Sequence, residues 1–91
     1  MNRFIPYNDL QFIEPEIIVP KMEKINQDIS DNTSIPDKIE SMNLIRSIRK
    51  SHFSYFIEIF NAVKPCFISN CLNISDPILQ KYSLKFLIEI F

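Results

Sequence analysis

Hydrophobic residues recur at helical spacing along most of this chain. The segment with the clearest helix signals is residues 34–52. Four residues at three- and four-residue steps share one side of that segment: Ser41, Leu44, Ile45 and Ile48. Two more apolar residues, Ile39 and Met42, lie on a flank of this side. The pattern predicts one helix with two buried sides. Such a helix is expected to pack between neighbours.

Both ends of this helix are marked in the sequence. Ser34 is a suitable N-cap, Pro36 falls in the first turn, and Asp37 places a negative charge at the helix N-terminus. Basic residues gather at the other end, where they complement the helix dipole: Arg46, Arg49 and Lys50.

A second apolar stripe follows His52 and is the strongest amphipathic signal in the chain. Its members fall within about 140° of helical arc: Phe53, Phe56, Ile57, Phe60, Val63, Phe67, Ile68 and Cys71. Pro65 interrupts the segment, so a kink near Asn61 or a break into two pieces is predicted. We interpret the aromatic stripe as core packing.

The last predicted helix begins at Pro77, with Ser75 or Asp76 as its cap. Its polar positions are mostly Lys81, Lys85 and Glu89, and apolar residues cover most of the remainder. A helix so widely apolar needs cover on more than one side. We therefore expect its end to pack against a partner through four residues: Leu87, Ile88, Ile90 and Phe91.

Residues 1–14 are apolar without a helical register, and they are interpreted as an extended arm lying on the helices or on a partner. Pro15 permits a helical start, but Pro20 lacks an amide donor and is expected to limit that piece to one turn. The better-supported first helix is therefore 20–29, followed by a polar loop at 30–33.

Composition narrows the possible functions. A chain of 91 residues with 46% hydrophobic and 23% charged residues is typical of one small globular domain. A net charge of −1 gives no electrostatic case for nucleic acid, and no uninterrupted apolar span or signal peptide is evident, so no membrane partner is expected. The absence of glycine argues against phosphate-cradling loops and dinucleotide fingerprints.

No catalytic residues, metal ligands or cofactor site are predicted. His52 is the single histidine and is interpreted as a loop residue at a helix end, while Cys66 and Cys71 point about 140° apart on a helix and are expected to be reduced thiols. The carboxylates are interpreted as solvated surface groups: Glu14, Glu16, Glu58 and Glu89. A non-enzymatic protein without a small-molecule substrate is expected.

One stretch resembles a known family. The run from Lys38 to Arg46, KIESMNLIR, with His52 six residues on, is similar to the first HEAT repeat of TOG domains, whose pattern is W-E-x-K-I-E-G-L-N-x-I-R. The likeness is strongest to the TOG-array regulators of axonemal microtubules, the crescerin group, and more distant to the CLASP proteins. It extends over residues 12–91 through the acidic-proline start at Glu14 and the apolar ending at 84–91.

The resemblance implies an all-α, HEAT/TOG-like α-solenoid. The arm would be followed by two helical hairpins, 15–51 and 53–91, the first two units of a stack that usually needs at least three. Further HEAT repeats or a partner chain would then cover the last helix. A closed four-helix bundle is the alternative fold, although a bundle would not leave its last helix apolar nearly all round.

The resemblance also implies tubulin contacts in the loops between paired helices. The family's loop tryptophan falls on Ile35 and a basic position on Lys38. The second loop corresponds to Asn73, Ile74, Ser75 and Asp76, with Lys81 one turn further. An aliphatic residue thus replaces the indole, and an acid stands where the family has a positive charge.

Two functions remain open from the sequence. The first is a TOG-like module that binds tubulin or the microtubule lattice, in the cytoplasm and cytoskeleton, including the cilium. The second is a non-catalytic structural subunit whose arm and last helix pack into a large assembly without direct tubulin contact. A membrane-surface helix has a weaker case because the final helix lacks a strongly basic face.

Overall fold

The computed structural model describes residues 3–30, 34–72 and 75–90. It contains a short 3-10 turn, η1 (Tyr7–Asp9), and four α-helices: α1 (Pro15–Ser30), α2 (Ile35–Ser51), α3 (Phe53–Phe67) and α4 (Pro77–Ile90). A π-helical segment, η2 (Ile68–Leu72), continues from α3. The predicted all-α class is confirmed, since these ranges contain no strand.

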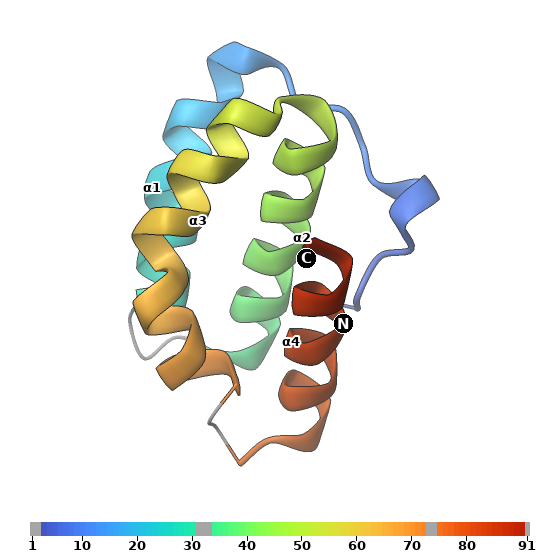
Figure 1. Ribbon diagram of the computed structural model, residues 1–91, viewed down its shortest axis with the longest axis vertical. Helices are drawn as coiled ribbons and strands as arrows, with labels where there is room; N and C mark the ends of the chain where they lie inside the picture. The colour runs from blue at the N-terminus through green and yellow to red at the C-terminus, as the bar shows by residue number, and fades with distance from the viewer. Residues whose placement is uncertain (1–2, 31–33, 73–74, 91) are drawn as a thin grey trace.

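Helix α2 is the centre of the molecule, with α1 and α3 on one side and α4 on the other (Figure 1). The prediction of a helix packed between neighbours is therefore confirmed. Its predicted start is also confirmed, because the Ser34 hydroxyl accepts a hydrogen bond from the Asp37 N–H at 3.3 Å. At its end His52 separates α2 from α3, as expected for a loop residue.

The first helix is longer than predicted. Helix α1 begins at Pro15 and passes through Pro20 without ending. Pro20 is the sixth residue of the helix, so its missing N–H removes only one hydrogen bond, to the Glu16 carbonyl, near the helix start. Burial of Ile18, Ile25 and Ile29 on one stripe then holds the whole helix against the core.

The second proline has a different consequence from the one expected. Helix α3 is not broken at Asn61 or at Pro65, and the irregularity appears after Pro65, where α-helix gives way to the π-helical η2. This change of winding begins at Ile68, three positions after Pro65, the residue that cannot donate a hydrogen bond within α3. It brings Asn70 and Cys71 against the ends of the neighbouring helices.

The N-terminal arm lies on the helices, which confirms one of the two expected placements. The Asn43 side chain donates to the Arg3 carbonyl at 2.7 Å and accepts from the Ile5 N–H at 3.2 Å. The Lys50 ammonium donates to the carbonyls of Tyr7 and Leu10. The arm is not extended throughout, since η1 forms its middle.

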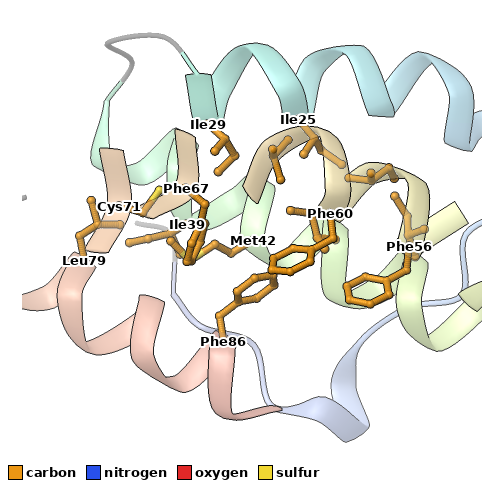
Figure 2. Packing of buried hydrophobic residues seen from close by; sticks show 14 of the residues in the cluster. Ile25, Ile29, Ile39, Met42, Phe56, Phe60, Phe67, Cys71, Leu79 and Phe86 are labelled. Carbon is orange, nitrogen blue, oxygen red and sulfur yellow. The ribbon is translucent and has the colours of Figure 1, made fainter. Parts of the chain in front are cut away.

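The core gathers side chains from all four helices. In Figure 2, Phe86 of α4 points toward Phe60 and Phe67 of α3, with ring centroids 6.2 and 5.2 Å away. Other helices contribute aliphatic residues to the same cluster, among them Ile25, Ile29, Ile39 and Met42. Helix α4 packs mainly against α2 and η2 rather than along the length of α3.

Candidate functional site

The end of α1, the start of α2, η2 and the start of α4 lie at the same end of the molecule (Figure 1). Asn70 of η2 ties two of these elements together, because its amide donates to the carbonyl of Ile29 at 2.8 Å and to that of Ser30 at 3.0 Å. These bonds satisfy carbonyls at the end of α1, which have no partner within that helix. We call this region the loop end.

The residues assigned to tubulin contact by resemblance are distributed unequally at the loop end. Ser75 and Lys81 are exposed, whereas Ile35 and Asp76 are half-buried. The Asp76 carboxylate accepts a hydrogen bond from the Leu79 N–H at 2.8 Å, which identifies it, of the two candidates, as the cap of α4. Asn73, and with it Ile74, lies outside the described residues.

Lys38 is not at the surface. Only 2% of this residue is exposed, and its ammonium donates to the Asp28 backbone carbonyl at 3.1 Å. A cation bonded to the last carbonyls of a helix is favourably placed in the helix dipole. Lys38 therefore stabilises the end of α1 and has no surface left to offer a partner.

Asp28 is the centre of the polar cluster beneath the loop end. Its carboxylate accepts a hydrogen bond from the Ser41 hydroxyl at 2.9 Å and forms an ion pair with Lys24 at 2.6 Å. The hydrogen bond from Lys24 to Asp28 raises the pKa of the Lys24 amine. The helical spacing predicts Ser41 on the buried side of α2, but no local pattern in the sequence indicates that Asp28 joins it.

Cys71 lies next to this cluster as a buried free thiol, and Cys66 is a half-buried free thiol. Burial raises the pKa of Cys71 to about 11, against a smaller opposing effect of the Lys38 charge. The thiolate is the reactive form of cysteine, and burial of Cys71 disfavours that form.

A second polar cluster joins the arm to α2 and α4. The Arg46 guanidinium forms a two-point ion pair with Glu89, at 2.7 and 2.6 Å, and stacks over the Phe4 ring at 3.8 Å. Phe4 in turn stacks on Tyr82 with centroids 5.5 Å apart. The interpretation of Glu89 as a solvated carboxylate was therefore wrong: its partner lies 43 positions away in the sequence.

The last helix leaves much apolar surface uncovered, as expected. Ile88 is 78% exposed, and Ile78 and Leu84 are more than half exposed. Leu87 and Ile90, which were assigned to partner packing together with Ile88, are instead half-buried against the core. Phe91 lies outside the described residues.

A hollow of about 610 Å³ lies between the arm, α1 and α2. Its lining mixes both signs of charge with apolar side chains, among them Arg3, Asp9, Lys21, Glu40 and Leu44. Across residues 3–30, 34–72 and 75–90, no three His, Cys, Asp or Glu side chains gather where they could hold a metal ion. None of the helices in the same ranges combines the length and apolar character needed to cross a membrane.

Comparison of the chain with family models, with curated proteins and with solved structures gave no match.

Proposed function

We propose that this chain is a TOG-like module that binds tubulin or the microtubule lattice through its loop end, in the cytoskeleton and including the cilium. The observation that carries the proposal is the meeting of η2 and the end of α1 at one end of the molecule, where the Asn70 hydrogen bonds tie them together. In a TOG-like stack, the loops between paired helices form the edge that contacts tubulin.

The helix packing supports the first of the two proposed hairpins, 15–51, since α1 packs against α2; in the second, 53–91, α4 packs against α2 and η2 rather than along α3. Helix α1 packs against α3, and α2 packs against α4, as in a stack of two helical layers. The centre of α2 carries the residues of the resemblance, and its position between the other helices suits the first repeat of such a stack.

Among the described residues of the loop end, Lys81 has the best chemistry for an acidic partner. It is exposed and lies one turn into α4, just beyond the cap at Asp76. Ile35 lies at the first position of α2, where the family pattern has tryptophan. Lys38 contributes by holding the end of α1 in place rather than by contact.

Co-sedimentation with microtubules over a salt series tests this proposal. We expect Lys81→Glu to weaken binding several-fold at low salt, because it reverses a charge that faces an acidic surface. Lys85→Glu is the matched control, since Lys85 is an exposed lysine one turn further from the loop end. Ile35→Trp restores the family's indole and is expected to tighten binding.

The proposal fails if the unmodified chain does not pellet at low salt. It also fails if Lys81→Glu and Lys85→Glu have equal effects, because the contact would then not involve the loop end.

The exposed apolar residues of α4 favour a second candidate, a structural subunit that docks through its last helix. Under this alternative the chain associates with its assembly without binding microtubules, and Ile88→Ser abolishes that association. Ile88→Ser leaves pelleting unchanged if the loop end is the contact.

A further inference from the structure

The uncovered face of α4 is both apolar and basic. Its residues follow one another at helical spacing on the side opposite the buried stripe, and all are exposed: Ile78, Lys81, Leu84, Lys85 and Ile88. Glu89, the acid of this helix, is turned toward Arg46. We call this surface the basic face, and it presents two positive charges without a neighbouring acid on the same helix.

The uncovered face of α1 has the opposite charge. Opposite its buried stripe it presents exposed residues at the same spacing: Glu16, Val19, Pro20, Glu23 and Gln27. Val19 is 63% exposed, so this surface also has an apolar part. Lys24, at its edge, is neutralised by Asp28. We call this surface the acidic face.

The helices that carry these two faces, α1 and α4, lie on opposite sides of the molecule with α2 between them (Figure 1). In the part of the chain that the structure describes, Glu16, Glu23, Lys81 and Lys85 form no ion pair. Two complementary helical faces that cannot reach each other within one molecule can meet between molecules.

We propose that the basic face of one copy of this chain docks on the acidic face of the next. The occupant is a second copy because this chain itself supplies the complementary charges and an apolar centre. Leu84 and Ile88 would lie against Val19 and Pro20, with Lys81 and Lys85 beside the glutamates. Since the two faces are different surfaces, the contact is heterologous and continues as an open head-to-tail row.

Such a contact buries little area beyond one helix per copy, so the association is weak and salt-sensitive. Sedimentation velocity on the whole chain, without tubulin, measures it from about 10 µM to about 1 mM. The average mass is expected to rise with concentration at low ionic strength and to fall back toward that of the monomer at about 1 M salt.

Paired charge reversals give the sharper test. In Lys81→Glu/Lys85→Glu both outer faces become acidic, and in Glu16→Lys/Glu23→Lys both become basic. Each double variant alone is expected to associate at least about tenfold more weakly, because like charges oppose one another. An equimolar mixture restores opposite charges at every contact and is expected to recover the association. All four positions are exposed, and circular dichroism verifies that each variant keeps its helices.

The inference is overturned if the unmodified chain remains monomeric over this range at low salt. It is also overturned if the double variants associate as strongly as the unmodified chain, or if mixing them gives no recovery. The sedimentation measurement requires no tubulin. Lys85 is part of the proposed contact between copies, whereas Lys85→Glu is the control variant, expected to have no effect, in the microtubule experiment. Failure of one proposal is therefore distinguishable from failure of the other.

Discussion

Helices α2 and α4 invert the usual relation between polarity and burial. Helix α2 contains buried Lys38, Ser41, Asn43 and Arg46, yet it is the central helix of the fold. Helix α4 is richer in aliphatic and aromatic residues, yet Leu84 and Ile88 point into solvent. The more polar of the two helices is the more deeply buried one.

The difference shows that burial depends on available partners as much as on apolar character. The polar groups of α2 meet carbonyls, carboxylates and an aromatic ring supplied by α1, α4 and the arm. Paired in this way, a buried polar group no longer costs its full desolvation free energy. Helix α4 has neighbours on one side only, so its remaining apolar residues stay uncovered.

The largest effect separates the two sides of α4. Phe86→Ala removes a fully buried ring between Phe60 and Phe67 and is expected to lower the free energy of unfolding by about 3–5 kcal/mol. Ile88→Ala is expected to change it by less than about 0.5 kcal/mol, because Ile88 is exposed. Urea denaturation of dilute samples measures both. Equal losses would show that α4 is covered on both sides.

The next largest loss of unfolding free energy is expected on substitution of Arg46, the most buried charged residue of α2. Arg46→Met leaves Glu89 without its ion pair and removes the contact with Phe4, so the free energy of unfolding should fall by about 2–4 kcal/mol. Lys85→Met, at an exposed cation of α4, should change it by less than about 0.5 kcal/mol. A loss at Arg46 no greater than that at Lys85 would contradict the role given to the pair.

Caps should contribute equally to the two helices despite their different burial. Ser34→Ala and Asp76→Ala are each expected to cost about 1 kcal/mol, because each removes an acceptor for an unpaired N–H in the first turn. Ser75→Ala, beside the α4 cap, should be close to neutral. Thermal or urea unfolding of the three variants checks this, and a cost at Ser75 equal to that at Asp76 would shift the cap to Ser75.

The smallest effect, when it is measured at pH 9, is the pH dependence contributed by Cys71. Its pKa is raised to about 11 in the folded protein from an ordinary value of 9.0, so the folded state holds the thiol proton more tightly than the unfolded state. This contribution is fully present below about pH 9 and is lost as the pH rises toward 11. The expected loss is about 0.4 kcal/mol at pH 9.

The difference in unfolding free energy between the unmodified chain and Cys71→Ala, followed from pH 7 to 10, isolates this contribution from other titrating groups. A difference that stays constant with pH would show that the folded and unfolded states have the same thiol pKa.

Local signals predicted much of the fold. The cap at Ser34, the start of α4 at Pro77, the buried sides of α2 and most of the apolar stripe of α3 depend on residues within a few positions of one another. Phe53, Ile57 and Ile68 belong to the predicted stripe but are exposed rather than packed in the core. Pro20 was predicted to end a helix and did not, because tertiary burial of α1 outweighs one lost hydrogen bond.

Less of the candidate site than of the fold could be predicted from the sequence. The sequence alone determined the four helices, their order and the apolar excess of α4. Only the tertiary structure decided that Lys38 is buried and that Glu89 pairs with Arg46, since the partners of these groups lie 10 and 43 positions away. Hydrophobic periodicity reports which side of a helix is apolar, but whether a charged residue is buried depends on a partner that only folding brings within hydrogen-bonding distance.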